Sequence, residues 1–396
     1  MRVVINRTLT LGRKTGIGHY TAELLRALKQ LTAAGQVIGF PAGWFWVVGQ
    51  ALSRPVLAGG ESGGSDNNTS LLGALKKKCS GVVRRAGQAY LRHALRSCLR
   101  KHECNLYHEP NTIPLPCDVP AIATIHDLSV ILHPHWHPAG RVAHFEKNLH
   151  RLTGAAHFIT VSEFTRQEAI RTFNLRPEKV TRIHLGSRMG LTPMLPAATA
   201  TRLAELRLPP RFLLYVGTIE PRKNLLLLMR AYGALPRSWR DRYPLVLAGS
   251  WGWSSGPVAE YFNDRGRHEG VIHLGYVSDL DLPALYSGAR ALVYPSIYEG
   301  FGLPPLEMMA CGGPVLASTA GAVAEIVGRR AHLIAPDDED GWRLAMQRVI
   351  EDDDWHASLC RGVRDLARSF TWERCAAETL HVYRMLAGEV PRKQAA

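Results

Sequence analysis

Short apolar runs alternate with segments of helical periodicity along almost the whole chain. Each run is four to seven residues long, and most are rich in Val, Ile, Leu, Phe or Tyr. Buried parallel strands have this composition, and they need helices as crossover connections. The pattern therefore predicts an α/β fold with parallel sheets covered by helices. The runs span residues 3–6, 36–40, 105–109, 121–127 and 157–162, then 212–217, 244–249, 271–276, 291–296 and 314–319.

The predicted strands fall into two groups, which indicates two domains. The chain has 396 residues, whereas a single hydrophobic core usually stops growing at roughly 250–300 residues. Residues 190–210, GLTPMLPAATATRLAELRLPP, are rich in proline and small side chains and separate the two groups of strands. We expect the domain boundary in this segment.

Composition favours a folded, cytoplasmic protein. Hydrophobic residues make up 46% of the chain and charged residues 21%, close to the averages for globular domains. The N-terminal stretch MRVVINRTLTLGRKTG lacks the apolar core of a signal peptide. The most apolar window, residues 37–52, is too short and too rich in Gly and Pro to cross a bilayer, although its aromatic residues could lie at an interface. Seven cysteines without a CxxC pair indicate reduced thiols.

Positive charge is concentrated in one segment. The net charge is +14, and residues 71–104 hold nine Lys or Arg against one acid. Within this segment Arg92, Arg96 and Arg100 stand one turn apart on one face of a predicted helix, where like charges repel one another. We expect this face to meet an anionic partner, namely lipid, a phosphorylated substrate or nucleic acid, and a merely solvated helix face is the alternative. The preceding residues 59–70, rich in Gly, Ser and Asn, predict a loop.

Loops that follow the strands hold the candidate chemistry, because ligands of open parallel sheets bind beyond the carboxyl ends of the strands. After the first strand, Gly16 and Gly18 precede a helical run whose N-terminus could approach a phosphate. Glycines at this place are equally compatible with a plain turn. His126 ends the strand at 121–127 and could reach a cleft, although a lone histidine is more often structural.

Two cations, Arg222 and Lys223, open the helical run that follows the strand at 212–217. Cations at a helix N-terminus oppose the helix dipole. This cost is explained if an anion such as a diphosphate docks between the cations and the helix end. Two exposed surface cations are the alternative interpretation.

The stretch YEGFGLPPLE, residues 298–307, sets Glu299 and Glu307 eight residues apart across glycines and prolines. It follows the strand at 291–296, and its prolines suit the start of a helix. Bare backbone N–H groups in Gly-Phe-Gly can approach a ligand, while a carboxylate can accept hydrogen bonds from both hydroxyls of a ribose or sugar. The stretch therefore predicts a binding site for a ligand that carries adjacent hydroxyls and a phosphate.

These stretches resemble the retaining glycosyltransferases of family four. The E-x7-E motif of that family matches Glu299 and Glu307 within PSIYEGFGLPPLEMMACGGPV. Residues 212–232, 271–289 and 370–383 match in the family's order, and the N-terminal half matches more loosely through GIGHYT, HDLSV and TVSEFTR. The resemblance implies the GT-B fold, in which two Rossmann-like domains face each other across a cleft. It implies an acceptor-binding domain at 1–195, a nucleotide-sugar-binding domain at 196–375 and a C-terminal helix at 376–396 that packs back on the first domain.

The resemblance also implies how a nucleotide-sugar is held. Lys223 and Arg222 would hold its diphosphate, and Glu307 would bind the ribose hydroxyls. Thr218 stands where many relatives have an arginine, so more of the charge neutralisation falls to the two cations. No Asp-x-Asp cluster is assigned to a divalent metal, and no metal or other cofactor is expected, so fixed cations and helix termini should stabilise the leaving diphosphate.

For the reacting sugar, the resemblance implies three groups of contacts. His126 would hydrogen-bond the donor sugar near the reacting carbon, which makes His126, Glu299 and Lys223 the expected catalytic residues. Gly16 and Gly18 would close on the phosphates from the opposite domain. The donor sugar would also face Glu299 and the backbone of Phe301, Gly302 and Leu303.

The implied reaction is transfer of mannose from GDP-mannose, with retention, to a polyprenyl-diphosphate-linked saccharide. The product would be a cell-surface polysaccharide such as O-antigen, capsule or exopolysaccharide, made on the inner face of the cell membrane, with the basic helix on anionic lipid and no nucleic acid involved. Transfer from UDP-glucose or a UDP-N-acetylhexosamine stays open. A non-catalytic basic protein that binds membrane or nucleic acid is a further alternative, and the lack of GxGxxG with a following acid disfavours a dinucleotide oxidoreductase.

Overall fold

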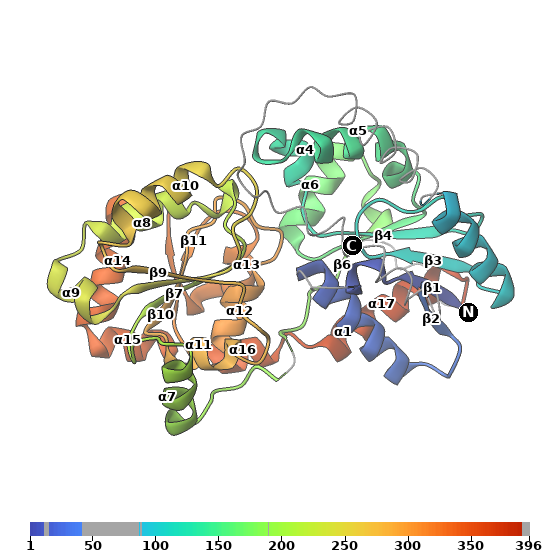
Figure 1. Cartoon of the computed structure of the whole chain (residues 1–396). Helices are drawn as coiled ribbons and strands as arrows, with labels where there is room; N and C mark the ends of the chain where they lie inside the picture. The colour runs from blue at the N-terminus through green and yellow to red at the C-terminus, as the bar shows by residue number, and fades with distance from the viewer. Residues whose placement is uncertain (12–15, 42–86, 88, 189, 390–396) are drawn as a thin grey trace.

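The computed structural model describes residues 1–11, 16–41, 87, 89–188 and 190–389 (Figure 1). These residues form two six-stranded parallel sheets, one after the other along the chain, and helices cover both. The fold predicted from the sequence, two Rossmann-like α/β domains, is confirmed. We call the parts of the chain around the first and second sheets the N-terminal and C-terminal domains.

The N-terminal domain has the strand order β2-β1-β3-β4-β5-β6, with all neighbours parallel. Its strands are β1 (Val3–Asn6), β2 (Val37–Phe40), β3 (Leu106–Glu109), β4 (Ala121–Ile125), β5 (His157–Thr160) and β6 (Val180–Arg182). Its helices are α1 (Gly16–Leu31), a helix at 89–101, α4 (Ser129–Leu132), α5 (Ala139–Thr153) and α6 (Glu163–Phe173), with short 3₁₀ turns at Thr8–Thr10, Pro134–Trp136 and Pro177–Lys179.

The C-terminal domain has the strand order β12-β11-β10-β7-β8-β9, again with parallel neighbours. Its strands are β7 (Leu213–Val216), β8 (Leu245–Ala248), β9 (Val271–Gly275), β10 (Ala291–Tyr294), β11 (Val315–Ser318) and β12 (His332–Ile334). Its longer helices are α7 (Pro196–Glu205), α8 (Leu225–Gly233), α11 (Leu282–Gly288), α12 (Leu303–Ala310), α14 (Glu339–Glu351) and α15 (Asp353–Cys360). Shorter ones are η4 (Pro221–Lys223), α9 (Arg237–Arg242), α10 (Gly256–Tyr261), η5 (Phe262–Gly266), α13 (Val323–Val327), η6 (Gly328–Arg330) and α16 (Val363–Arg368).

The chain crosses between the domains twice, and the two crossings touch. The first runs through Gly186 and Ser187, and the second through Phe370 before the last helix, α17 (Trp372–Leu386). The indole N–H of Trp372 donates to the Ser187 carbonyl at 2.8 Å, and a Cβ on Gly186 would lie 2.6 Å from the Trp372 nitrogen. Glycine at 186 therefore lets the crossings pack against each other and form the hinge.

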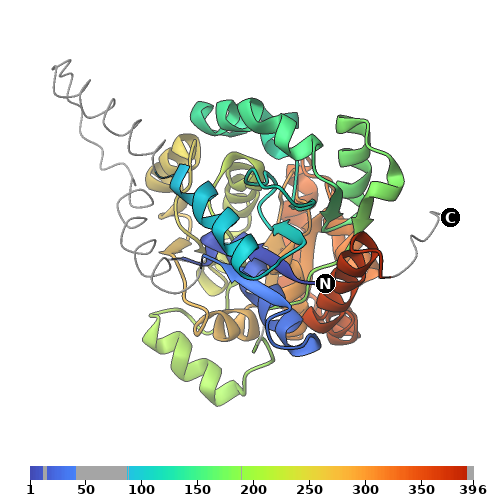
Figure 2. The same ribbon diagram turned by 90° about the vertical axis from the view of Figure 1, so that its right-hand side faces the viewer.

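Helix α17 returns to the N-terminal domain and packs against α1. In α1, Tyr20, Leu24 and Leu28 recur every four residues and are buried, which gives the helix one apolar face. The Thr371 hydroxyl accepts a hydrogen bond from the Arg374 N–H and so caps α17. Figure 2 shows the chain's N-terminus beside the end of this helix, where the terminal amino group pairs with Glu389 at 2.8 Å.

Two features of the strands and the connection differ from the sequence prediction. Strands β6 and β12 were not predicted, because each is only three residues long and carries too little periodicity to stand out. The segment at 190–210 is not wholly irregular, since it contains α7, whose Leu203 is buried. Helix α7 packs against α11 of the C-terminal domain.

The basic segment is described only in part. The predicted loop at 59–70, most of the apolar window at 37–52 and the first half of the basic helix lie outside the described residues. In the helix at 89–101, Leu95 and Leu99 are buried against the sheet, and Arg92, Arg96 and Arg100 are exposed.

Three further findings concern the described residues alone. No helix in them is long and apolar enough to cross a membrane. No group of three or more His, Cys, Asp or Glu side chains in them is placed to hold a metal ion. Six cysteines in this part of the chain are free thiols.

Candidate active site

The loop after β10 in the C-terminal domain contacts the loop after β4 in the N-terminal domain. A Cβ added to Gly300 would lie 1.7 Å from the carbonyl oxygen of His126, so only glycine permits this approach. The Thr165 hydroxyl also donates to the Gly300 carbonyl at 3.2 Å. The junction brings the first glutamate of YEGFGLPPLE and the predicted histidine together, although they are far apart in the sequence.

Glu299 lies at this junction with both carboxylate oxygens occupied. Its Oε1 accepts hydrogen bonds from the Lys223 ammonium and, at 2.8 Å, from the Tyr294 hydroxyl. Its Oε2 accepts from the Arg222 guanidinium at 2.8 Å. Glu299 and Lys223 are both buried, so the structure brings the three predicted charged residues into one cluster.

The charges in this cluster decide the ionisation of Glu299. Burial alone would raise the pKa of its carboxyl, but Arg222 and Lys223 outweigh burial and lower that pKa to about 2. Burial and the neighbouring Arg222 lower the pKa of Lys223. Burial opposes the charge of Arg222, yet Glu299 and Glu220 raise its pKa well above the usual value. Glu299 is therefore a carboxylate at neutral pH and has no proton to give as a general acid.

The prediction that Arg222 and Lys223 open a helix is wrong. Arg222 and Lys223 form the short 3₁₀ turn η4, and α8 begins only at Leu225. They are also not surface cations, because Glu299 pairs with both and Glu220 accepts from the Arg222 Nε at 2.7 Å. Internal carboxylates thus balance both cations, and their presence does not by itself require a bound anion.

Glu307, in α12, is 1% exposed and has different partners. The Tyr286 hydroxyl donates to its Oε2 at 2.7 Å, and the Arg188 Nε donates to its Oε1 at 3.1 Å. A carboxylate offers about four acceptor positions. Arg188 and Tyr286 therefore use two of these positions and hold the carboxylate in place.

Arg188 is the main residue that the sequence analysis missed. It lies on the first crossing and also pairs with Asp279, in the loop after β9. Asp279 in turn lies 3.7 Å from the Nε2 of His19 in α1. The sequence gives no local signal for Arg188, whereas His19 adjoins the predicted Gly18 and Asp279 follows a predicted strand. The three side chains link the hinge, both domains and Glu307.

The segment Asp279-Leu280-Asp281 has the Asp-x-Asp form, which the sequence analysis did not assign. Arginines neutralise both acids, since Asp279 pairs with Arg188 and Asp281 with Arg202. Hydrogen bonds from Ser278 and Arg202, together with the charge of Arg202, lower the pKa of Asp281 despite burial. Paired carboxylates of this kind are poor candidates for a magnesium site, because the cation would have to displace the arginines.

A cavity of about 330 Å³ lies between α1 and the carboxyl ends of β7, β8 and β9. We call it the donor cavity. Two glycines shape it, because a Cβ on Gly249 would lie 1.8 Å from the Gly217 carbonyl oxygen. Thr218 is exposed to it, and the first turn of α1 faces it with backbone N–H groups that favour an anion. Its lining is Gly16, His19, Arg188, Val216, Gly217, Thr218, Ala248, Gly249, Ser250, Tyr276, Val277, Asp279 and Leu282.

His126 and Asp127 end β4 on the N-terminal side of the junction. The Nε2 of His126 lies 2.9 Å from the Pro110 carbonyl oxygen and donates to it, which leaves Nδ1 as an acceptor. Burial lowers the pKa of His126, so the imidazole is neutral at pH 7. Burial would raise the pKa of Asp127, but the charge of Arg222 and hydrogen bonds from Ser129 lower it overall. Asp127 is thus a third carboxylate close to Arg222, after Glu299 and Glu220.

The remaining predicted residues lie at the Glu299 junction, in α1 and on the helix at 89–101. Gly302 has a φ of 100° and caps α12 ahead of Leu303, so its backbone follows the Glu299 junction directly. Phe301 is buried against Phe370 and His184. Gly18 is buried within α1. The residues predicted to meet a membrane or acceptor, Arg92, Arg96 and Arg100, lie elsewhere, on the helix at 89–101. Of these, Arg96 pairs with Asp118 at 3.4 Å.

Several polar contacts hold the two domains together around the junction. Glu325 of α13 accepts the backbone N–H groups of Glu163 and Phe164 at 2.9 and 3.1 Å, at the start of α6. The Trp253 indole N–H donates to the Trp136 carbonyl at 2.7 Å. These contacts hold the two domains against each other around the Glu299 junction, and we call this the closed arrangement.

Two family models match the chain. "Glycosyl transferases group 1" matches residues 202–365, and "Glycosyltransferase Family 4" matches residues 70–187. An "O-antigen chain mannosyltransferase B" of Escherichia coli is 37% identical over 94% of this chain and 96% of that protein.

Solved structures are similar over nearly the whole chain. A sucrose-phosphate synthase from Thermosynechococcus elongatus matches with a TM-score of 0.70 at 21% identity, over 98% of this chain and 100% of that one. The Anabaena protein HepE, in complex with UDP-glucose, matches with a TM-score of 0.68 at 18% identity, over 96% of this chain and 100% of that one. At these identities the structures establish the shared fold of two facing Rossmann-like domains.

Proposed function

The chain belongs to glycosyltransferase family 4, and we propose that it transfers mannose from GDP-mannose to a lipid-linked saccharide during O-antigen assembly. The observation that carries this proposal is the 37% identity, over nearly the full length of both chains, to an O-antigen chain mannosyltransferase. The site supports a nucleotide-sugar as the donor, because Arg188 lines the same cavity as the N-terminus of α1 and donates to the buried carboxylate of Glu307.

In this proposal the ribose hydroxyls donate to Glu307, and the diphosphate lies between the first turn of α1 and the cluster of Lys223 and Arg222. As the bond to the leaving diphosphate breaks, negative charge develops on its oxygens. The two cations and the helix N-terminus are fixed before the reaction, so they stabilise that charge without reorganising. Metal-independent transfer is part of the proposal, since these groups supply the positive charge.

We further propose that configuration is retained without a covalent link to Glu299. A nucleophilic carboxylate needs a free oxygen aimed at the sugar carbon. Here Lys223, Arg222 and Tyr294 occupy both oxygens of Glu299. Attack by the acceptor hydroxyl on the face that the diphosphate leaves accounts for retention and leaves Glu299 to position the cations. Neutral His126, with a free Nδ1 acceptor, then takes a hydrogen bond from a hydroxyl of the donor sugar.

The acceptor and the membrane belong to the N-terminal domain in this proposal. The helix at 89–101 buries Leu95 and Leu99 and exposes Arg92, Arg96 and Arg100, which suits contact with anionic lipid head groups. The enzyme would lie at the inner face of the cell membrane and receive a polyprenyl-diphosphate-linked saccharide. Flotation with phosphatidylglycerol vesicles tests this, and a protein that stays at the bottom of the gradient argues against it.

A UDP-sugar donor is the second candidate, favoured by the UDP-glucose complex of the structurally similar HepE. Thermal unfolding with GDP-, UDP-, ADP- and TDP-sugars, without added metal, separates the candidates, because a ligand that binds only the folded state raises its stability. We expect GDP-mannose alone to raise the midpoint, and expect Glu307→Ala and Lys223→Ala to abolish the shift. A shift with UDP-sugars alone would replace the first candidate by the second, and no shift at millimolar concentration would refute the donor site.

A further inference from the structure

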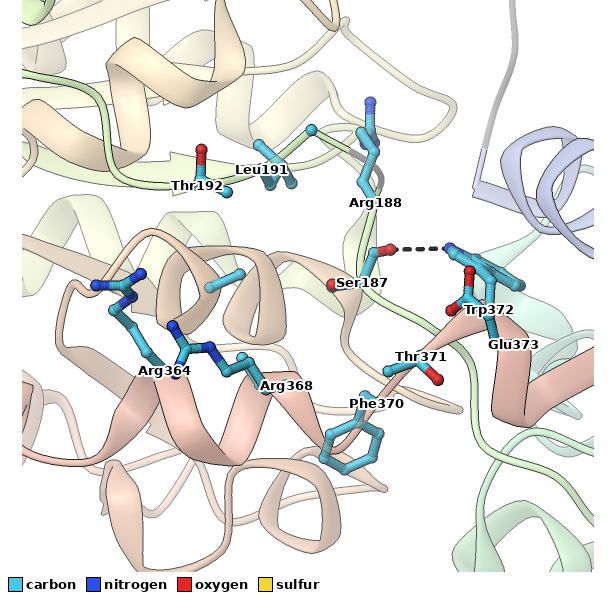
Figure 3. Close-up of a pocket in the computed structure, with 13 residues that line it drawn as sticks. Ser187, Arg188, Leu191, Thr192, Arg364, Arg368, Phe370, Thr371, Trp372 and Glu373 are labelled. Atoms are coloured by element: carbon cyan, nitrogen blue, oxygen red, sulfur yellow. Dashed lines mark hydrogen bonds between the residues drawn. The ribbon is translucent and has the colours of Figure 1, made fainter. Parts of the chain in front are cut away.

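A cavity of about 370 Å³ opens at the hinge. Its walls come from residues 187, 188 and 190–192 of the first crossing, from α16, and from residues 370–373 of the second crossing (Figure 3). Arg188 is the one residue that it shares with the donor cavity, and the Arg188 guanidinium is engaged with Glu307 and Asp279. This hinge cavity is therefore a second site, separate from the cavity assigned to the donor.

Two arginines of α16 line one end of the hinge cavity. In Figure 3 the side chains of Arg364 and Arg368 project from α16 toward the chain that carries Leu191 and Thr192. Within the described residues, Arg364 has no hydrogen-bond or ion-pair partner, and Arg368 has only Asp365, at 3.4 Å on its own helix. Like charges one turn apart disfavour a helix, so the pair has an electrostatic cost that a bound anion would remove.

The opposite part of the hinge cavity has a different chemistry. The carboxylate of Glu373 lies beside Trp372 at the end away from Arg364 (Figure 3). A carboxylate and an indole edge suit hydroxyl groups and a sugar ring, whereas paired guanidinium groups suit the oxygens of a phosphoryl group, which they bind in bidentate fashion. The cavity thus matches a small anion with a phosphoryl group at one end.

We propose that the hinge cavity binds a phosphoryl-bearing anion through Arg364 and Arg368, and that the bound anion favours the closed arrangement of the two domains. The cavity has this shape while Gly300 touches His126 and Glu325 caps α6. A ligand shifts a conformational equilibrium toward the state that binds it better. Because both crossings form the walls, a change in the angle between the domains changes the cavity.

The hinge cavity also adjoins the parts that hold the ribose carboxylate. Ala310, which lines it, ends the helix that carries Glu307, and the stem of Arg364 packs on the turn at Gly312. Arg188 connects the same wall to Glu307 directly. An anion in the hinge cavity should therefore tighten nucleotide binding, and this second part of the proposal rests on the proposed function of the donor cavity.

Calorimetric titration of the full chain with inorganic pyrophosphate tests the site. The double variant Arg364→Ala with Arg368→Ala is compared with a matched control, Arg237→Ala with Arg329→Ala, which removes two exposed cations that line neither cavity. We expect wild type and control to bind equally and the hinge variant to bind about tenfold more weakly or worse. Equal binding in both double variants would overturn the site. Circular dichroism checks folding, and Arg364→Gln with Arg368→Gln replaces an alanine variant that fails to fold.

A parallel titration uses a hexose 1-phosphate. The ligand with the lower dissociation constant shows whether the hinge cavity prefers a free inorganic anion or a sugar phosphate. Coupling is measured as the affinity for GDP and UDP with pyrophosphate present, and the hinge variant supplies the baseline, because pyrophosphate also competes for the place that the diphosphate takes in the donor cavity. We expect this affinity to be about fivefold higher in wild type than in the hinge variant. Equal affinities in the two proteins would overturn the coupling. If neither nucleotide binds at all, the donor assignment fails, whereas the difference between the two double variants still decides the hinge site.

Discussion

The two domains each bury a carboxylate at the carboxyl end of a central strand, and the two acids behave oppositely. Glu109 ends β3 and is 3% exposed, and Glu299 follows β10 and is 6% exposed. Burial raises the pKa of Glu109 to about 7, because its hydrogen-bond donors, Tyr107, Asn6 and the Asn111 N–H, only partly offset burial. The pKa of Glu299 falls to about 2, because Arg222 and Lys223 more than offset the same burial.

The difference shows where each domain places fixed charge. Neutral donors satisfy the hydrogen bonds of Glu109 but stabilise its charge only in part, so it completes a polar network inside the N-terminal domain. Around Glu299 the carboxylate fixes two cations, Arg222 and Lys223. The C-terminal domain therefore holds fixed charges of both signs in one buried cluster, and in the proposed function the two cations of this cluster and the first turn of α1 stabilise the leaving diphosphate.

Removal of Lys223 should have the largest effect. In Lys223→Ala the ammonium disappears, and Glu299 keeps only Arg222 as a cationic partner. Loss of one donor that stabilises a developing anion typically costs about 10²–10³ in turnover, so we expect kcat/KM with GDP-mannose to fall by about that factor. Steady-state assays of the variant, with Lys147→Ala as an exposed control, check this. A loss below about threefold would show that Lys223 does not act in catalysis. Glu299 would then be, like Glu109, a buried acid that only completes a polar network.

The next largest effect should come from Arg188, which orients Glu307 from the hinge. We expect Arg188→Ala to weaken binding of a nucleoside diphosphate by about 10–100-fold, because a charge-assisted hydrogen bond contributes about 1.5–3 kcal/mol. Titration with the 2′,3′-dideoxy nucleotide supplies the control, since it cannot use Glu307 and should bind wild type and variant alike. An equal loss with both nucleotides would mean that Arg188 acts on the phosphates or on folding and not through the ribose carboxylate.

Glu109 gives a prediction in pH. Its folded pKa, about 7, lies above the ordinary value of 4.5, so the folded state holds a proton that the unfolded state has lost. Stability from this group is therefore complete below the unfolded pKa and is lost as pH rises through about 7, by on the order of 2 kcal/mol.

We expect Glu109→Gln, which cannot ionise, to keep that stability at higher pH. Urea unfolding of wild type and variant at pH 5 and pH 8 measures the difference. His108 next to it titrates in the opposite sense, because burial lowers its pKa to about 3, and the comparison with the variant cancels this contribution. A variant whose stability changes with pH as much as that of wild type would show that Glu109 does not titrate in this range.

Local motifs were predictable from the sequence, and contacts between distant segments were not. Glu299, Glu307 and Lys223 were found because each lies in the segment that directly follows a buried strand, where ligands of parallel sheets bind. That Glu299 neutralises Lys223 could not be seen, since the pair is 76 residues apart in the chain. Arg188 and Asp279 come from separate segments, and no spacing rule connects them to Glu307. The three-residue strands β6 and β12 likewise depend on their neighbours in the sheet and not on their own sequence.

Substitution of Glu325 should have the smallest effect. This acid shows what donors do to a pKa when burial is only partial. Burial would raise its pKa, yet His184 and the backbone N–H groups of Glu163 and Phe164 lower it, and its side chain is 25% exposed. His184 and the donors at a helix N-terminus together lower the pKa of this partly buried acid, whereas the donors of fully buried Glu109 do not overcome its burial. Glu325→Gln keeps the size of the side chain but removes its charge and one of its two acceptor oxygens at the start of α6, which should cost about 1 kcal/mol at pH 7. Since the folded pKa of Glu325 is depressed, this difference from wild type should shrink as pH falls through that pKa. Unfolding curves at pH 7 and pH 3.5 measure it, and a difference that persists at pH 3.5 would show that the shape of the cap, and not its charge, holds the two domains together there.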